Sequence, residues 1–395
     1  MPVRWWAVLI ALAAAGILIP AGPLAHFTYA MAAAGLIALW VVRRVGSSLL
    51  FAQRVTPTHV PPGEAVHVEL TVANRSRLPV PWLWWRQVLP VQLETESGFE
   101  GSGAVAAGGR STFRFAFHPR RRGRYRIGRV EYRHGDWFGL HAQEGEAVLP
   151  LWVTVYPRVL PFPRLPVRPL VPTGPRRDAS SPFREELALG VRDYQSGDAL
   201  RHIAWKASAR HGRLQVREFP RVRARSLSLV VDLAPMNWNG RAARRHVERL
   251  LSLAASYLWA PPEGDHPVGL LTFAASVRYV PEGTGLDEEP ARLVRVTPRT
   301  GLAHRREVLE ILACLQPGEG PALAQLLLAH GSLLGFGEGL LILTGRYDPA
   351  TWDAAALLAA RHHPVSLIVL EDAIIPPCQG VGIYRVTLEG EIRWL

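Results

Sequence analysis

Lysine is nearly absent from this chain. Of its 45 Lys and Arg residues only Lys206 is a lysine, and no phosphate-binding glycine pattern precedes it. A P-loop needs the lysine of Gly-x-x-x-x-Gly-Lys-Ser/Thr to reach the phosphates of a nucleotide, so the sequence excludes a P-loop NTPase. The same scarcity disfavours a kinase-type lysine and a lysine that forms a Schiff base with a cofactor.

Cysteine is also scarce. Cys314 and Cys378 are too few for a structural zinc site, and a disulfide between them is not expected in a reducing compartment. The sequence has no Gly-x-Ser-x-Gly, His-Glu-x-x-His or Cys-x-x-Cys, and no Gly-x-Gly-x-x-Gly that opens a helix. We therefore expect no enzymatic activity, no catalytic residue and no cofactor.

Two long apolar runs stand at the N-terminus, residues 5–19 and 24–42. At 1.5 Å per helical residue, each covers most of a hydrocarbon core about 30 Å thick. Arg4 precedes the pair and Arg43-Arg44 follow it, whereas the loop between the runs is uncharged. The two adjacent runs predict a transmembrane helical hairpin over residues 1–46, and the positive-inside rule predicts that both of its ends are cytoplasmic. In this interpretation the protein is a two-pass protein of the inner (cell) membrane, in contact with lipid through both runs, with both termini and the folded domains cytoplasmic.

Residues 56–156 have the pattern of an all-β domain. Apolar and polar residues alternate over 66–72 and again over 111–117, with turn residues between such segments. Short strands at this spacing over about 100 residues predict an immunoglobulin-like sandwich.

The same domain contains a strongly basic segment. Residues 110–133 hold nine arginines and one acid, Glu131. Either these arginines face the anionic inner leaflet of the membrane, or they lie on a solvated strand face. A nucleic-acid-binding face is a third, less favoured alternative, because no helix-turn-helix, RNP pattern or zinc finger accompanies the charge.

Residues 157–225 form a third segment, a proline-rich strap followed by a dense motif. Eight prolines between 157 and 182 exclude a helix and predict an extended connection. The motif that follows reads Gly190-x-Arg192-x-Tyr194-x-x-Gly197-Asp198-x-x-Arg201-x-Ile203-x-Trp205-Lys206-x-Ser208-Ala209-Arg210. It resembles the signature of a bacterial family known as domain of unknown function 58 (DUF58).

Further motifs agree with this resemblance, among them Asp136-Trp137-Phe138-Gly139-Leu140. The resemblance implies a membrane-anchored protein with a von Willebrand A-like domain that associates with a MoxR-type AAA+ ATPase.

The signature itself has two interpretations. Asp198 is placed to cap a short helix over 199–209, which would bring the arginines of the motif near acidic side chains. One interpretation is a buried cluster of ion pairs and tryptophan that docks the strap. The other is a partner surface made of Arg192, Tyr194, Gly197, Asp198, Arg201, Trp205, Lys206 and Arg210.

From residue 226 the periodicity changes. Apolar strands, such as 226–233 and 268–274, alternate with amphipathic helices, such as 241–259. This alternation predicts a mostly parallel sheet covered on both faces. We expect residues 226–395 to form an α/β von Willebrand A-like (Rossmann-type) domain, which the family resemblance also implies.

Such domains commonly bind Mg²⁺ through Asp-x-Ser-x-Ser and a later threonine. Here the motif reads Asp232, Ala234 and Met236, followed by Thr344 and the cation Arg346. Mg²⁺ requires several oxygen ligands in an octahedral array, and these residues supply too few. The sequence therefore predicts a degenerate site that holds no metal.

The function expected from the sequence is a membrane-tethered cytoplasmic interaction or adaptor protein, working with a MoxR-type AAA+ ATPase in assembly or envelope processes. Two alternatives remain at this point. One is an unrecognised hydrolase that uses Asp198 or Asp232 as acid or base. The other is a basic nucleic-acid-binding protein.

Overall fold

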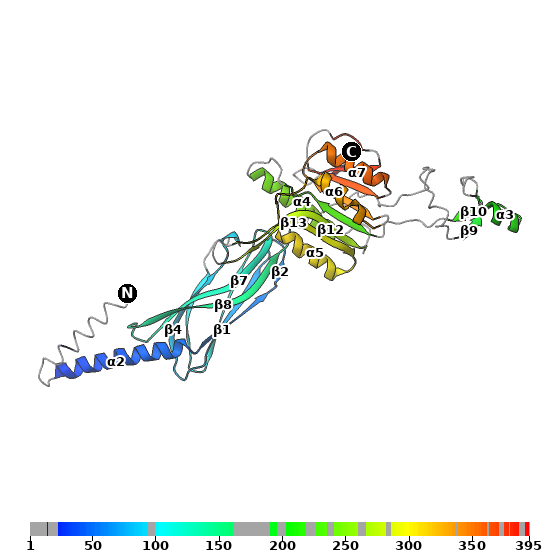
Figure 1. Ribbon diagram of the computed structural model, residues 1–395. Coiled ribbons are helices and arrows are strands. Elements are labelled where there is room, and N and C mark those ends of the chain that lie inside the picture. Colours follow the sequence, from blue (N-terminus) through cyan, green and yellow to red (C-terminus); the bar gives the residue numbers. More distant parts are fainter. Residues whose placement is uncertain are drawn as a thin grey trace. The chain divides into compact units, whose positions relative to one another are not determined.

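The computed structural model in Figure 1 has two compact units. Unit 1 contains Met1–Leu160, Ala274–Ala291 and Arg306–Gly318, and unit 2 contains Pro161–Phe273, Arg292–Arg305 and Glu319–Leu395. The structure describes Ala14 and residues 23–93, 99–160, 190–195, 203–218, 226–234, 241–259, 266–281, 286–335, 338–361, 363–370, 375–378, 380–386 and 392–394.

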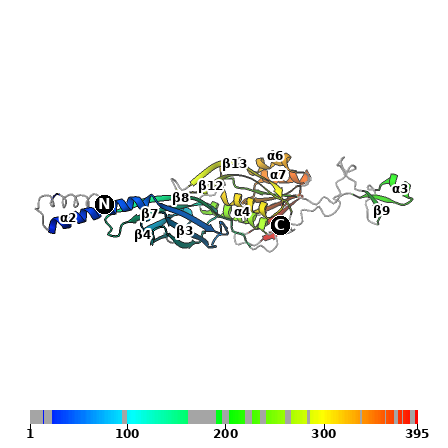
Figure 2. The ribbon, with the colours of Figure 1, turned by 90° about the horizontal axis from the view of Figure 1, so that it is seen from below.

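The apolar helix α2 (Pro23–Gly46) of unit 1 is about 36 Å long at the usual rise. Its window Tyr29–Gly46 has a mean hydropathy of 1.3, so α2 is long and apolar enough to cross a membrane. Figures 1 and 2 show its C-terminal end running into the strands of unit 1, where Val41, Val42 and Val45 are buried.

The predicted two-helix hairpin is wrong for the part of the chain that the structure describes, which contains one apolar helix long enough to span a membrane. The first predicted run, residues 5–19, lies outside the described residues except for Ala14. The end of α2 packs instead against a β core that includes Leu49, Val72 and Val130. Hydropathy predicts how much of a helix is apolar, and it does not predict which surface that helix packs on.

The first sheet of unit 1 is antiparallel. It consists of β1 (Leu49–Thr56), β3 (Val66–Asn74) and β6 (Arg110–Phe117), in the order β1-β3-β6. Side chains on β3 alternate between deeply and less deeply buried positions, because successive residues of a strand face opposite sides.

A second set of strands packs against the first around a shared core. Its main strands, in the order β5-β4-β7-β8, are all paired antiparallel: β4 (Val80–Val88), β5 (Phe99–Val105), β7 (Gly123–Gly135) and β8 (Ala142–Val155). The short β2 (His59–Val60) joins β8 in parallel, and the 3₁₀ turn η1 (Val91–Leu93) follows β4. In the core between the two sets, Trp85 stacks on Phe115 and contacts Phe113 in a tilted arrangement.

Unit 1 also takes in segments from much later in the chain. Tyr279, at the end of β12 (Val268–Tyr279), pairs with Tyr125 of β7, and their rings stack with centroids 4.9 Å apart. The last turns of α5 (Leu302–Cys314) and the short β14 (Leu315–Gln316) belong to the same unit.

Unit 2 is built on a sheet in the order β18-β17-β16-β15-β11-β12. Its strands are β11 (Leu227–Val231), the first half of β12, β15 (Gly339–Thr344), β16 (Val365–Val369), β17 (Val381–Val386) and β18 (Ile392–Trp394). The pairs from β12 to β17 are parallel, and β18 is antiparallel to β17. The other elements are α4 (Arg241–Trp259), α6 (Leu323–His330), η4 (Gly331–Leu333) and α7 (Pro349–Ala360). β13 (Leu286–Arg299) pairs with β12, and its residues from Arg292 onward belong to this unit.

The predicted succession of an immunoglobulin-like domain and a von Willebrand A-like (Rossmann-type) domain is wrong. The sheets are mixed: β12 pairs in parallel with β11 and β7 and antiparallel with β14. Periodicity along the chain predicts strands one at a time, and it carries no information on which distant strands form hydrogen bonds with each other.

Candidate functional site

The family signature folds into a small hairpin with a helix, which we call the signature module (described residues 190–195 and 203–218). The strands β9 (Gly190–Asp193) and β10 (Gln215–Glu218) are antiparallel, with Val216 opposite Arg192. Ile203 adds an isolated bridge to Val216, and α3 (Trp205–His211) follows at once. Gly212 ends α3 in the left-handed conformation, at φ 66°, which glycine adopts without strain.

Polar groups inside the signature module bond to one another. The Ser208 hydroxyl donates to the carbonyl of Ala204 at 3.0 Å and accepts from the backbone N–H of Gln215 at 2.8 Å. The Gln215 amide in turn donates to the Asp193 carboxylate. Ile203 and Val216 are buried beside these bonds. This network fixes α3 against the hairpin through contacts within the module.

Several signature side chains face solvent. Trp205 is 67% exposed at the first turn of α3, and Lys206 and Arg210 are exposed four residues apart on one face of that helix. Val191 and Leu214 add exposed apolar area from the hairpin. These five residues are called the signature surface below. Sequence reasoning identified the first three; Val191 and Leu214 were missed, although their apolar side chains in a short polar hairpin are a detectable signal.

The remaining predicted signature residues are distributed differently. Arg192 donates from its guanidinium to the carbonyl of Asp193 at 3.1 Å, and the half-buried Tyr194 bonds through its backbone N–H to Leu214 at 3.0 Å. Both therefore hold the hairpin. Gly197, Asp198 and Arg201 lie outside the described residues.

The predicted degenerate metal site lies in unit 2. Because β11 and β15 are parallel neighbours, Asp232 follows one strand where Thr344 ends the other. The Thr344 hydroxyl donates to Asp232 Oδ2 at 2.8 Å, and the Ala234 N–H donates to Oδ1 at 3.3 Å. Burial raises the pKa of Asp232, and these two hydrogen bonds and the charge of Arg346 oppose that shift.

Oδ2 of Asp232 thus ties the ends of β11 and β15 together, and Oδ1 holds the backbone that follows β11. Met236 lies outside the described residues, and the described part of the chain has no group of three or more His, Cys, Asp or Glu side chains that could hold a metal ion. The hydrolase alternative assigned Asp232 an acid or base role; here its carboxylate is engaged by protein donors.

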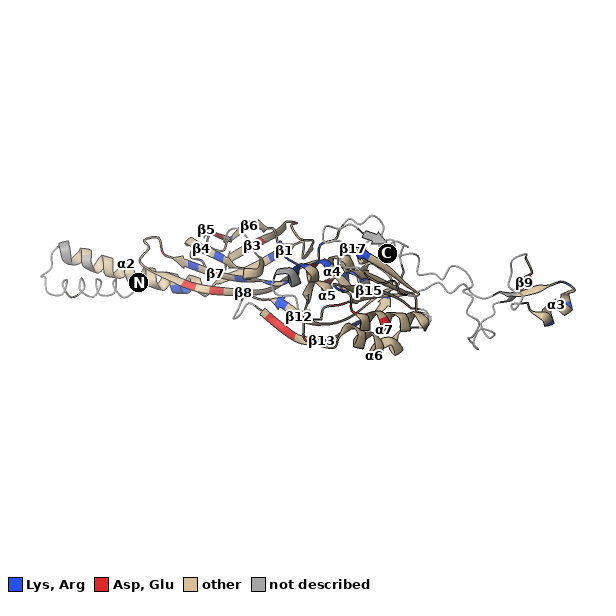
Figure 3. Ribbon diagram, turned by 90° about the horizontal axis from the view of Figure 1, so that it is seen from above, with Lys and Arg blue, Asp and Glu red and all other residues tan. Residues whose placement is uncertain are grey.

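Three of the nine arginines of the basic segment 110–133, Arg114, Arg129 and Arg133, form ion pairs with acids of unit 1. Arg114 lies 2.8 Å from Glu69, Arg129 lies 3.0 Å from Glu146, and the side chain of Arg122 is buried. Figure 3 shows acidic stretches on β8 beside basic ones on β7. The acidic partners lie on β3 and β8, outside the basic segment 110–133. This pairing supports the solvated strand face over a continuous cationic patch.

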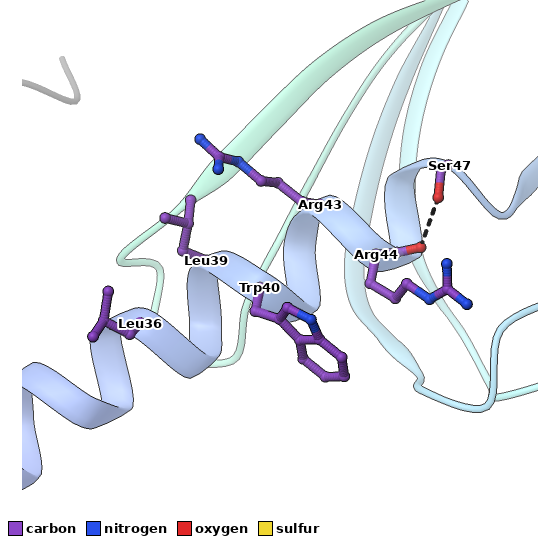
Figure 4. A pocket seen from close by; sticks show the side chains of 6 residues that line it. All are labelled: Leu36, Leu39, Trp40, Arg43, Arg44 and Ser47. Atoms are coloured by element: carbon purple, nitrogen blue, oxygen red, sulfur yellow. Dashed lines mark hydrogen bonds between the residues drawn. The ribbon is translucent and has the colours of Figure 1, made fainter.

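A shallow hollow lies along the C-terminal half of α2 (Figure 4). Leu36, Leu39, Trp40, Arg43, Arg44 and Ser47 line it. At the end of the helix, the Ser47 hydroxyl donates a 3.0 Å hydrogen bond to the carbonyl of Arg44. The combination of an exposed tryptophan with arginines one turn later is typical of the position where a membrane helix leaves the hydrocarbon core.

Two comparisons bear on the signature. Residues 190–324 match the family described as "Protein of unknown function DUF58". The uncharacterized protein YeaD of Bacillus subtilis (strain 168) is 25% identical over 255 residues, which are 63% of this chain and 61% of that protein. The chain therefore spans less than two thirds of this relative. Both matches support the DUF58 resemblance, and neither assigns an activity.

Solved structures give weaker likenesses. The CARDB domain of the PF1109 protein from Pyrococcus furiosus, solved with di-metal ions, is 16% identical, with a TM-score of 0.21 over 27% of this chain and 91% of that one. The sporulation control protein Spo0M of Bacillus subtilis is 12% identical, with a TM-score of 0.18 over 28% of this chain and 51% of that one. Both TM-scores are too low to indicate a shared fold.

Proposed function

We propose that this protein is a membrane-tethered, non-catalytic interaction protein whose signature surface binds a partner protein. Helix α2 serves as the tether. The exposure of Trp205 is the observation that carries the proposal. An aromatic side chain of this size, 67% exposed beside Lys206 and Arg210, has the composition found at the energetic centres of protein interfaces.

The scaffold beneath Trp205 supports the same proposal. The hydrogen bonds of Ser208 and Gln215 lie within the signature module, so α3 presents its surface in a fixed form. A surface that is ordered before binding loses less conformational entropy when a partner docks. The partner that the family resemblance implies is a MoxR-type AAA+ ATPase, in an assembly or envelope process.

The proposal also includes the side of the membrane on which the chain after α2 lies. Arg43 and Arg44 follow the apolar part of α2, and the positive-inside rule favours a cytoplasmic location for everything after the helix, at the inner (cell) membrane. An ATPase of the cytoplasm and the signature surface would then share a compartment.

The test is co-purification of the full chain from native membranes, with the bound proteins identified by mass spectrometry. Three forms are compared: the natural chain, Trp205→Ala, and the matched control Trp259→Ala, which removes another tryptophan that is 62% exposed. An AAA+ ATPase enriched with the natural chain and with Trp259→Ala, and lost with Trp205→Ala, is the expected result. Equal recovery with all three forms would contradict the signature surface. Nucleic acid that co-purifies and is released by salt would favour the nucleic-acid alternative.

A further inference from the structure

The turn between β7 and β8 exposes two large aromatic side chains next to each other. Trp137 is 59% exposed and Phe138 is 75% exposed. Apolar side chains of this size at a turn normally fold back onto the protein, because leaving them in water forfeits the free energy of their burial. A cluster left in solvent marks a surface that meets something else.

The turn that carries these aromatics is fixed by the carboxylate of Asp136, which is itself buried. Its Oδ1 accepts from the backbone N–H of Phe138 at 2.7 Å, and its Oδ2 accepts from that of His141 at 2.6 Å. Trp82 donates its indole N–H to the carbonyl of Asp136 at 3.0 Å. The exposure of Trp137 and Phe138 is therefore built into the turn.

The turn lies beside α2, within unit 1. The imidazole Nε2 of His134 on β7 donates to the carbonyl of Val42 on α2 at 3.2 Å. Figures 1 and 4 show the β7–β8 hairpin running back along α2 toward the N-terminal end of that helix. β7 ends at Gly135, one residue beyond His134, and Trp137 follows in the turn that leads to β8. The aromatic pair thus lies beyond the level of Val42, toward the N-terminal end of α2.

The exposed surface of α2 at this level is apolar, and cations follow on the side of the β strands. Leu36, Ile37 and Trp40 are exposed on the helix. Below them, at the same end of the β strands as the turn, lie the exposed arginines Arg43, Arg44, Arg75, Arg77 and Arg110. An apolar helix surface followed by arginines at this end of the strands matches the order of acyl chain, interface and anionic headgroup in a bilayer.

We propose that the turn 136–141 is a second membrane contact, in which Trp137 and Phe138 insert into the bilayer interface beside α2. The proposal rests on the tether of the proposed function, since it requires α2 to cross the membrane. We expect the two side chains to insert by about 5–10 Å, which is the depth of an interfacial anchor. Two points of contact would fix the angle between the β strands of unit 1 and the bilayer. A contact through α2 alone would leave that angle free to vary.

The test uses the full chain in vesicles of phosphatidylcholine with and without phosphatidylglycerol. Three variants, Phe138→Cys, Ala33→Cys and Glu64→Cys, each carry one added environment-sensitive fluorophore. Ala33 is an exposed residue of α2, and Glu64 is exposed in the turn before β3, at the opposite end of the β strands. The unsubstituted chain gives the background from Cys314 and Cys378. Lipid-borne quenchers placed near the headgroups or near the bilayer centre report the depth of each fluorophore.

We expect the label at 138 to be quenched severalfold more strongly by the headgroup-proximal quencher than the label at 64. The label at 33 should be quenched best by the central quencher. Quenching at 33 without quenching at 138 would overturn the second contact while leaving the tether intact. Absence of quenching at 33 would overturn the tether itself.

A companion variant, Asp136→Ala, removes the carboxylate that fixes the turn while keeping both aromatics. In combination with the label at 138, it should broaden the depth distribution and reduce shallow quenching. If the label at 138 is shielded only after a cytoplasmic protein extract is added, the turn binds a protein and the membrane proposal is wrong.

Discussion

Arg122 donates a 2.8 Å hydrogen bond from its guanidinium Nη1 to the backbone carbonyl of Leu315, 193 residues later in the chain. The same nitrogen lies 3.1 Å from the carbonyl of Ala313. The last carbonyls of a helix have no partner within the helix, and a buried cation satisfies them at the end of α5. This relationship explains why Arg306–Gly318 belongs to unit 1.

Replacing Arg122 should therefore destabilise unit 1. Arg122→Met keeps the aliphatic stem and leaves the buried carbonyls unsatisfied, which costs about 1–3 kcal/mol. Arg120→Met is the matched control, because Arg120 is exposed two residues away and should change stability by less than about 0.5 kcal/mol. Denaturant unfolding of the detergent-solubilised full chain measures both. Equal stability of the two variants would show that the bond to Leu315 contributes nothing.

The imidazole of His134 predicts a pH dependence of stability. Burial lowers the pKa of His134 below its ordinary value of 6.5, although its bond to Val42 opposes the shift. The unfolded chain therefore binds a proton at this site more readily than the folded one. The stabilisation is present above pH 6.5 and is lost as the pH falls toward the lower, folded value. Melting curves at successive pH values should show this loss, and His134→Gln should flatten it. An unchanged pH profile in the variant would assign the loss to other groups.

The Asp232 site should not respond to Mg²⁺. Its carboxylate already accepts from Thr344 and Ala234. A metal that bound only the folded state would add about 2.7 kcal/mol of stability at a hundredfold excess over its dissociation constant. Thermal melting of the full chain with millimolar Mg²⁺ or with a chelator should give the same midpoint as the untreated protein. A rise of several degrees that Asp232→Ala abolishes would establish a metal site there.

The orientation of the tether predicts the compartment of the C-terminus. In the proposed function Arg43 and Arg44 follow the membrane-spanning part of α2, and the positive-inside rule then predicts a cytoplasmic location for the folded part of the chain. A reporter that is active only in the cytoplasm, fused after residue 395, should therefore be active. Activity of a periplasm-specific reporter at the same position would contradict the orientation and remove a cytoplasmic ATPase from consideration.

Individual strands and helices were largely predictable from the sequence. The alternation over 66–72 and 111–117 correctly predicted β3 and β6, and the amphipathic segment 241–259 coincides with α4. These predictions succeed because side-chain periodicity is a local property. The pattern predicts a strand over 268–274, whereas β12 continues without interruption to Tyr279. Its pairing with Tyr125 of β7 extends it, and that partner is distant in sequence.

The candidate site was partly predictable for the same reason. Sequence spacing located Trp205, Lys206 and Arg210 on one short helix, but it left open whether the tryptophan was buried. Its exposure depends on Ser208 and Gln215, whose hydrogen bonds hold the other face of α3 against the hairpin. The turn at Asp136 was quoted only as a motif, because backbone N–H groups that bond to one carboxylate leave no pattern of residue types.

Site-specific photo-crosslinking at position 205 in living cells tests the central claim most directly. A photoreactive phenylalanine analogue replaces Trp205 in the full chain, and the same analogue replaces Trp259 as the control. The account predicts a covalent adduct with an AAA+ ATPase from position 205 and none from position 259. The absence of a protein adduct at 205, or the same adducts from both positions, would contradict the assignment of the signature surface as the partner-binding site.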